Sequence, residues 1–235
     1  MGTRFVRKEL KYLISREQKN QLITLLRDEI THDEYCQDGQ PYHIRNIYFD
    51  TDQFDVIRHS IGKPKFKSKL RIRSYEDQTQ YLELKSKFRG TVYKKRIAIT
   101  MAEEQAFINR LELPQRDDYP SISALNDIKM YLEHFAPQLK QIRLDYQREA
   151  YVTFPKRTPT RLTFDHDLRV YDELAKGWMD LLPADMYLFE IKCSNALPLT
   201  IARALNQLAI YPTSFSKYGT YYKLIKSPKG DQTHV

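Results

Sequence analysis

Charged and apolar side chains alternate in several short segments of this chain. Between residues 69 and 75 it reads KLRIRSY, so Lys69, Arg71 and Arg73 fall on one face of an extended chain, and the intervening leucine and isoleucine fall on the other. This period of two predicts a β-strand over 66–75. The charge on that strand is confined to one face, and the same arrangement recurs in later segments.

Alternation and turn signals predict about eight strands, or nine when the segment 219–225 is counted, with helices inserted between them. Strands are expected at about 4–13, 43–51, 66–75, 79–87, 91–100, 140–152, 160–170, 186–193 and 219–225. Helices are expected at about 15–30, 52–60, 102–111, 121–136 and 198–209. Ser15 with Gln18 three positions later forms a capping-box pattern, and Phe88-Arg-Gly predicts a hairpin turn.

These elements favour an α+β fold built on one large antiparallel sheet or barrel. The sequence shows no repeat, low-complexity linker or domain boundary, so residues 1–235 are predicted to form a single domain. If the sheet closes into a barrel, the charged faces point inward and line a tunnel. The apolar faces then pack against helices outside the barrel.

The charged faces contain mostly arginine and lysine, with a few carboxylates. The residues in phase are Tyr81, Glu83, Lys85 and Lys87; Lys94 and Arg96; Tyr146 and Arg148; Arg161, Asp165, Asp167 and Arg169; and Glu190 and Lys192. One interpretation is a solvated sheet face, which is common in antiparallel sheets. However, like charges side by side on a sheet are destabilising, so their recurrence favours a face that holds a polyanion.

The chain of 235 residues has a formal net charge of +8, which also favours an anionic partner. Nucleic acid is not the expected partner, because the basic residues alternate along strands instead of forming a surface run with stacking aromatics. The two cysteines match no metal or disulfide pattern, and no apolar run is long enough to span a membrane. The N-terminus lacks an apolar signal core, so a cytoplasmic protein is expected.

A tunnel lined by arginine and lysine suits a chain of phosphates. Arginine grips phosphate oxygens in a bidentate manner, and lysine acts as a point charge. A phosphate would repel the carboxylates, which make sense as ligands of Mg²⁺ or Mn²⁺ bridging to phosphate oxygens. The expected ligand is therefore a nucleoside triphosphate, tripolyphosphate or polyphosphate.

An ordered set of short motifs resembles a known family. The motifs are Glu9-Leu-Lys-Tyr, Asn46-Ile-Tyr-Phe-Asp-Thr, Lys69-Leu-Arg-Ile-Arg-Ser-Tyr, Leu82-Glu-Leu-Lys, Arg161-Leu-Thr-Phe-Asp-His-Asp, Phe189-Glu-Ile-Lys and Ser216-Lys-Tyr. Together, over about residues 4–225, they resemble the VTC domain, the polyphosphate polymerase domain of the vacuolar transporter chaperone. That domain belongs to the triphosphate tunnel metalloenzyme superfamily.

The resemblance implies an eight-stranded antiparallel β-barrel that binds triphosphate and a divalent metal. It implies catalytic, phosphate-holding roles for Arg71, Arg73, Lys85, Lys94, Arg148 and Arg161. It implies further phosphate contacts for Lys11, Arg96, Tyr146, Ser216 and Lys217, and makes Glu190 the ligand of Mn²⁺ or Mg²⁺. For each of these residues the alternative is a salt bridge inside the barrel.

The resemblance implies a polyphosphate polymerase that uses ATP, since positioning and electrostatics can carry phosphoryl transfer without a covalent nucleophile. Hydrolases of the superfamily open with Glu-x-Glu-x-Lys, whereas this chain has Arg7 at the first glutamate position. The loss of that carboxylate favours the polymerase over a triphosphatase. A triphosphatase and a non-enzymatic binder of polyphosphate or RNA remain alternatives. The resemblance is also compatible with a membrane-protein partner that would hold the chain at the inner face of the membrane. The sequence does not predict the oligomeric state.

Overall fold

A computed structural model of the chain describes residues 7–36, 39–76, 79–89, 91–135, 139–154, 159–172, 176–194 and 196–226. Over this part the hydrogen-bonded order of the main strands is β1-β10-β8-β7-β3-β4-β5-β6, while β2 pairs with β7 and β9 (Gly177–Asp180) pairs with β8. The eight strands of this path match the predicted number. The ladder of described strands has two ends, at β1 and β6, so these strands do not form a hydrogen-bonded closed barrel.

The chain divides into two compact units. The first comprises Met1–His43, Tyr146–Arg169 and Asp180–Lys217, and the second comprises Ile44–Asp145, Val170–Met179 and Tyr218–Val235. Strands β3 (Tyr42–Thr51), β7 (Leu139–Thr153) and β8 (Arg161–Asp172) each contribute residues to both units. The prediction of a single domain stays a prediction.

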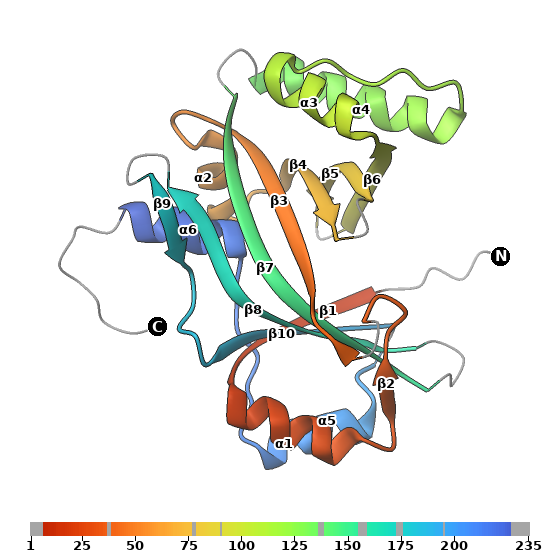
Figure 1. Ribbon diagram of the computed structural model, residues 1–235, viewed down its shortest axis with the longest axis vertical. Helices are drawn as coiled ribbons and strands as arrows, with labels where there is room; N and C mark the ends of the chain where they lie inside the picture. Colours follow the sequence, from red (N-terminus) through yellow and green to blue (C-terminus); the bar gives the residue numbers. More distant parts are fainter. Residues whose placement is uncertain are drawn as a thin grey trace. The chain divides into compact units, whose positions relative to one another are not determined.

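The first unit is built on antiparallel pairing of β1 (Arg7–Ser15) with β10 (Met186–Ser194), and of β10 with β8. Helices α1 (Arg16–Leu26) and α5 (Leu199–Gln207) lie side by side against these strands (Figure 1). The short strand β2 (Ile30–His32) follows α1 and pairs with the end of β7. The core contains Ile14, Leu22, Phe164, Phe189 and Ile201, each fully buried, so one face of β1, β8 and β10 is apolar as the alternation predicts.

The capping box predicted at Ser15 is present. The Ser15 hydroxyl accepts a hydrogen bond from the Gln18 backbone N–H at 3.1 Å, and the Gln18 side-chain oxygen accepts one from the Ser15 backbone N–H at 3.0 Å. These two bonds satisfy donors that the first turn of a helix otherwise leaves without partners.

Replacing Ser15 with alanine should lower the free energy of unfolding by about 0.5–2 kcal/mol, because the hydroxyl acceptor of the cap is lost. Chemical denaturation would show the change as a lower midpoint with an unchanged slope. The Ser15→Asp variant should keep most of the stability, since aspartate also caps helices. Equal loss in both variants would contradict a capping role for this side chain.

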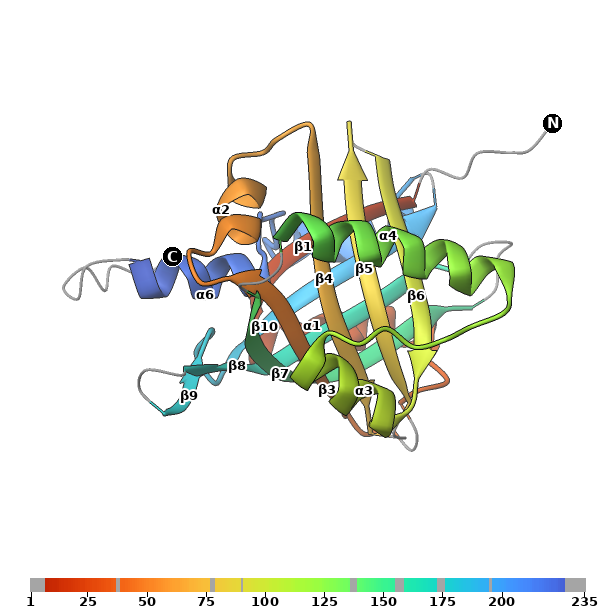
Figure 2. The same cartoon turned by 90° about the horizontal axis from the view of Figure 1, so that it is seen from above.

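The second unit contains β3, β4 (Phe66–Tyr75), β5 (Gln80–Phe88) and β6 (Thr91–Ile99), which pair in that order as antiparallel neighbours. Helices α3 (Met101–Arg110) and α4 (Tyr119–Phe135) lie across one face of β4, β5 and β6 (Figure 2). That face carries Leu70, Ile72 and Leu82, which pack with Phe107 and Ile128 of the two helices. The opposite face of the same strands carries the basic residues.

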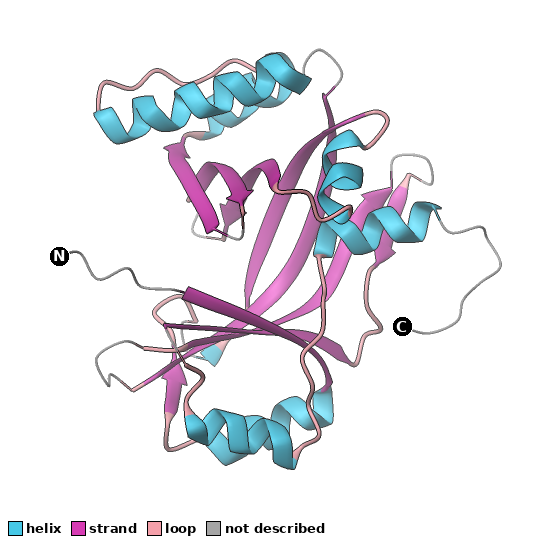
Figure 3. Ribbon diagram, turned by 180° about the vertical axis from the view of Figure 1, so that it is seen from behind, coloured by secondary structure: helices cyan, strands magenta, loops and turns pink. Residues whose placement is uncertain are grey.

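Two further helices complete the second unit, α2 (Asp55–Ile61) and most of α6 (Lys217–Lys226) (Figure 3). The buried Asp50 carboxylate accepts hydrogen bonds from the backbone N–H groups of Val56 and Ile57 at 2.9 and 3.0 Å. It also accepts one from the Tyr218 hydroxyl at 2.5 Å. Asp50 therefore joins the start of α2 to the start of α6.

The prediction of a strand at 219–225 is wrong, because this segment is part of α6. Tyrosine and threonine favour strands, but Tyr218 and Tyr221 are three positions apart and share the buried face of a helix. The helix expected at 15–30 ends at Leu26, and β2 follows it. The strands β2 and β9 were not predicted, while the other expected helices and strands lie close to their predicted positions.

Candidate functional site

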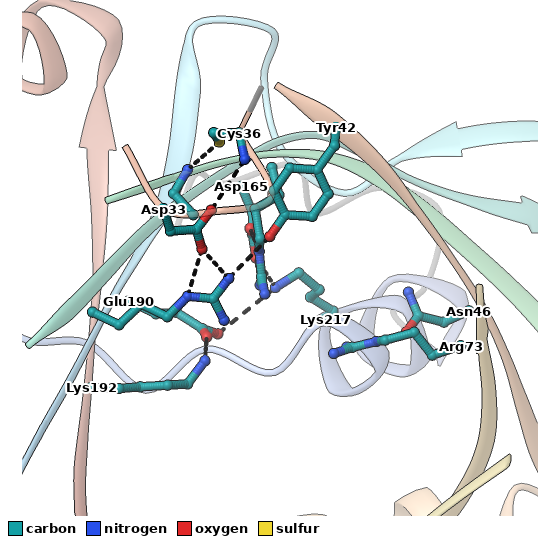
Figure 4. Close-up of polar contacts among 12 residues, drawn as sticks. Asp33, Cys36, Tyr42, Asn46, Arg73, Asp165, Glu190, Lys192 and Lys217 are labelled. Atoms are coloured by element: carbon teal, nitrogen blue, oxygen red, sulfur yellow. Dashed lines mark hydrogen bonds and ion pairs between the residues drawn. The ribbon is translucent and has the colours of Figure 1, made fainter. Parts of the chain in front are cut away.

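Glu190 of β10 lies at the centre of a group of lysines in the first unit. Its side chain is 7% exposed, and its carboxylate lies 3.3 Å from the Lys11 Nζ, 3.2 Å from the Lys192 Nζ and 3.8 Å from the Lys217 Nζ. The pairing of β1 with β10 places Lys11 directly opposite Glu190. Strand alternation places Lys192 on the same face as Glu190, and the two side chains meet there (Figure 4). One buried carboxylate is thus shared by three ammonium groups.

Burial opposes the ionised form of Glu190, but the charges of Lys217, Lys192 and Lys11 outweigh it and hold the pKa of the carboxyl well below its usual range. Burial also lowers the pKa of Lys192 to about 8, and the nearby Glu190 only partly restores it. Lys11 also lies 3.5 Å from the Glu9 carboxylate, and Lys217 shares Asp165 with Arg148, so the group has four cations against three carboxylates. The remaining positive charge suits the binding of an anion.

A second carboxylate of this unit, Asp165 of β8, is fully buried. It accepts two hydrogen bonds from the Arg148 guanidinium, at 2.6 and 2.7 Å, and one from the Lys217 Nζ at 2.5 Å. Burial raises the pKa of its carboxyl, but Arg148 and Lys217 reverse that effect and lower it. Tyr146 lies beneath both cations, with its ring centroid 4.5 Å from the Lys217 Nζ and 5.3 Å from the Arg148 Cζ.

Arg161 forms a third cluster at the start of β8. Its guanidinium donates two hydrogen bonds to one Asp33 carboxylate oxygen, at 3.0 and 2.5 Å, and one to the Tyr42 hydroxyl at 3.1 Å. The Arg161 side chain is still 28% exposed, so part of it faces solvent. An arginine held from one side in this way can present its remaining donors to a phosphate.

The second unit contains a comparable cluster around Glu83 of β5, which is 1% exposed. Arg71 of β4 donates two hydrogen bonds to the Glu83 carboxylate, at 2.8 and 2.6 Å, and Lys94 of β6 lies 2.5 Å from its other oxygen. Burial raises the pKa of Glu83, but Arg71, Arg73 and Lys94 together lower it to about 2. Arg71 also donates to the Tyr48 hydroxyl at 3.1 Å.

The remaining predicted residues of the second unit share this strand face. Arg73 donates to the Asn46 side-chain oxygen at 3.0 Å. The Arg96 guanidinium lies 4.5 Å from the centroid of the Tyr81 ring. Lys85 is exposed and stands opposite Lys94 on the neighbouring strand.

The structure thus places Arg148, Arg161, Lys11, Tyr146, Lys217 and Glu190 in the first unit, with Arg71, Arg73, Lys85, Lys94 and Arg96 in the second. Ser216, also in the first unit, is exposed and directly precedes α6. Lys95 departs from the charge pattern because it points to the other face, where its Nζ lies 2.7 Å from the Asp127 carboxylate of α4. The Arg7 side chain lies outside the described part of the chain.

Asp165, Asp167 and Arg169 were predicted to share one face of β8, but the structure does not place all three side chains on one face. Asp165 is fully buried, whereas the Asp167 side chain is 59% exposed. Asp167 has a φ of 50°, a left-handed backbone conformation that interrupts simple strand alternation. Asp167 thus lies away from the buried carboxylate, and its side chain pairs with the His166 ring at 3.0 Å.

Several residues of these clusters were not predicted as site residues. Among them, Lys192, Asp165 and Glu83 are in phase with predicted residues, so the alternation held a signal for all three. Asp33 gave no signal, because it lies in a loop 128 positions from its partner Arg161. Pairing of this kind is visible only in the folded chain.

Among the described residues, no group of three or more histidine, cysteine, aspartate or glutamate side chains could hold a metal ion. The residues present fit a cation held mainly by substrate, since Mg²⁺ commonly uses one or two carboxylates, water and phosphate oxygens. Thr163 supports this fit. It stands opposite Glu190 in the ladder, is 1% exposed, and its hydroxyl oxygen has no hydrogen-bond partner within the described structure.

The fold and these clusters define a class of protein: an α+β tunnel fold whose strands carry arginine and lysine around single buried carboxylates. The chain belongs to the VTC domain family, whose model matches residues 6–226. This match confirms the resemblance seen in the sequence. No curated protein matches the chain.

Two solved structures show the same fold. One is a putative adenylate cyclase from Bacillus halodurans, with 20% identity, a TM-score of 0.54, and coverage of 90% of this chain and 94% of that chain. The other is a putative adenylyl cyclase from Hippeastrum, described as having a dominant triphosphatase activity, with 17% identity, a TM-score of 0.54, and coverage of 93% and 96%. These likenesses confirm the predicted tunnel-fold class. In the described residues, no helix is long and apolar enough to cross a membrane.

Proposed function

We propose that this protein is a metal-dependent phosphotransferase that uses ATP to extend a polyphosphate chain. The observation that carries the proposal is the position of Glu190, a single buried carboxylate among three lysines and beside a buried hydroxyl with no partner in the described structure. Membership of the VTC family supports the same reading. The substrate class is a chain of phosphates, with ATP, triphosphate and polyphosphate as its members.

The cations would bind and orient the phosphates. Arg148 and Arg161 are each anchored by a buried carboxylate, which holds the guanidinium in place while other donors can face a ligand. Lys11 and Lys217 would move from Glu190 toward phosphate oxygens when a ligand arrives. Arg71, Arg73, Lys85 and Lys94, with Arg96, would act in the same way on the second unit.

Glu190 would then hold Mn²⁺ or Mg²⁺, with the Thr163 hydroxyl beside it. When bound, such an ion supplies charge neutralisation on the terminal phosphates. The residues of this chain supply positioning and electrostatic stabilisation, which together can carry phosphoryl transfer. A terminal oxygen of the acceptor polyphosphate would attack the γ-phosphorus of ATP, the bond from that phosphorus to the β–γ bridging oxygen would break, and ADP would leave. No side chain forms a covalent bond in this step.

A triphosphatase is the second candidate function. The Hippeastrum protein of similar fold is described as having a dominant triphosphatase activity. In that reading water replaces the acceptor phosphate, and the same cations bind the triphosphate. A protein that binds the phosphate chain without turnover is the third reading. A membrane-protein partner and a position at the inner face of the membrane remain predictions.

Incubation of the pure protein with ATP and Mn²⁺ should yield polyphosphate as the main product and free phosphate as a minor one. A gel stained for polyphosphate and a phosphate assay would measure both, and a chelator should abolish both. The Arg7→Glu variant should shift the balance toward hydrolysis, since a carboxylate at that position would favour a second metal that activates water. Rapid release of phosphate without polymer at any enzyme concentration would instead support the triphosphatase.

A further inference from the structure

The basic face of β4, β5 and β6 continues beyond the residues assigned above. Lys69 and Lys85 stand directly opposite each other, and so do Lys85 and Lys94. One step further along the strands, Lys67 stands directly opposite Lys87. We call Lys67 and Lys87 the outer lysine pair.

Like charges opposite each other on a sheet are destabilising, so this arrangement needs a reason. Within the described residues, no carboxylate lies within ion-pairing distance of Lys85 or Lys87. The Lys67 Nζ donates to the Ser60 carbonyl at 3.1 Å, which gives it a neutral partner only. Burial and the charges of Lys87, Lys85 and Lys63 lower the pKa of Lys67, so its charge is not compensated locally.

The outer lysine pair extends the row of cations that begins with Arg71 beside Glu83. Lys67, Lys69, Arg71 and Arg73 occupy alternate positions of β4 and therefore share one face. Four such positions span roughly 20 Å at about 3.3 Å per residue. A ligand that follows this line meets new positive charge at every second residue.

From this register we propose that the outer lysine pair binds phosphate groups of a linear polyphosphate, beyond those held by Arg71 and Lys94. This inference rests on the proposed function and adds that affinity rises with chain length. The outer pair then contributes to long chains and not to tripolyphosphate.

Two other polyanions fit the same surface less well. A membrane would need several apolar side chains beside the lysines, but Phe66 and Phe88 lie on the opposite strand face, the one that continues to Leu70, and Val92 is a single apolar residue on the lysine face. Single-stranded RNA would need aromatic rings beside the outer lysine pair to stack its bases, whereas Tyr81, the aromatic residue of β5 on this face, lies six positions from Lys87. At the level of the outer pair, the residue of β6 on that face is Val92.

The test compares binding of tripolyphosphate and long-chain polyphosphate by calorimetry. The Lys67→Gln/Lys87→Gln double variant should lose about tenfold in affinity for the long chain, the factor expected from two exposed ionic contacts. Its affinity for tripolyphosphate should not change. The single Lys87→Gln variant should show part of the loss and leaves the contact of Lys67 with Ser60 intact. The matched control is Lys129→Gln, at an exposed lysine of α4, which should behave as the wild type.

Thermal unfolding checks that the double variant folds, and its midpoint should equal or exceed that of the wild type because a repulsion is removed. Unchanged affinity of the double variant for the long chain would overturn the proposal. An equal loss of affinity for tripolyphosphate and for the long chain would also overturn it. So would a loss of affinity for single-stranded RNA or for anionic lipid vesicles that equals the loss for the long chain. Failure of the wild type to bind even tripolyphosphate would instead count against the proposed function itself.

Discussion

The Glu190→Gln variant should lose metal-dependent turnover by about 10³-fold or more, while its binding of polyphosphate stays equal or becomes tighter. Loss of the carboxylate removes the proposed ligand of the ion, which supplies several kcal/mol of charge stabilisation. The same change leaves Lys11, Lys192 and Lys217 without their shared counter-ion. These lysines then attract phosphate more strongly.

Two measurements separate turnover from binding in this variant. Product formation from ATP and Mn²⁺ measures the first, and calorimetry with polyphosphate in the absence of metal measures the second. Glu133→Gln is the matched control, because it makes the same chemical change at an exposed position of α4. Full activity of Glu190→Gln would remove this residue from the mechanism. Loss of both turnover and binding would indicate that Glu190 mainly orders the lysines.

The Asp165→Asn variant should lose about 3–5 kcal/mol of folding free energy. Asp165 is fully buried and is the acceptor for both Arg148 and Lys217, which are themselves 6% and 11% exposed. Removing one partner of a buried ion pair leaves an uncompensated buried charge, which is strongly destabilising. Denaturation of this variant and of Asp28→Asn, a change at an exposed carboxylate, would measure the difference.

The stability difference between the wild type and Asp165→Asn should depend on pH. Because the folded state lowers the pKa of Asp165, its stabilising contribution is complete above the unfolded pKa, about 3.9. That contribution is lost as the pH falls through the lower folded pKa. The two proteins should therefore converge in stability below about pH 4. A difference that stays constant down to acid pH would show that the ionised carboxylate is not the source of the stability.

The alternation of charged and apolar residues predicted most of the sheet and much of the candidate site. Arg71 and Arg73 share a face because side chains in a strand point alternately to its two sides. Glu190 and Lys192 followed the same rule on β10. These features depend on residues close in sequence, so local geometry is enough to predict them.

Partners across the sheet depended on register, which no single strand contains. Lys11 reaches Glu190 because β1 and β10 pair in one particular register, and a slip by one residue would move Lys11 to the other face. The pairing of Arg161 with Asp33 joins a strand to a loop far away in sequence. Burial, which lowers the pKa of Lys192 to about 8, and the neighbouring cations, which lower the pKa of Glu83 to about 2, are likewise properties of the assembled chain.

The sequence by itself determined the strand faces, the capping box at Ser15 and the family, because each rests on short-range pattern or on an ordered set of motifs. The tertiary structure alone decided that residues 217–226 form a helix, since burial of Tyr218 and Tyr221 outweighs the strand preference of their residue types. It also decided that the Lys217 Nζ meets Asp165 and Glu190. The physical reason is that side chains far apart in sequence become neighbours only when packing and hydrogen bonding bring their strands and helices together.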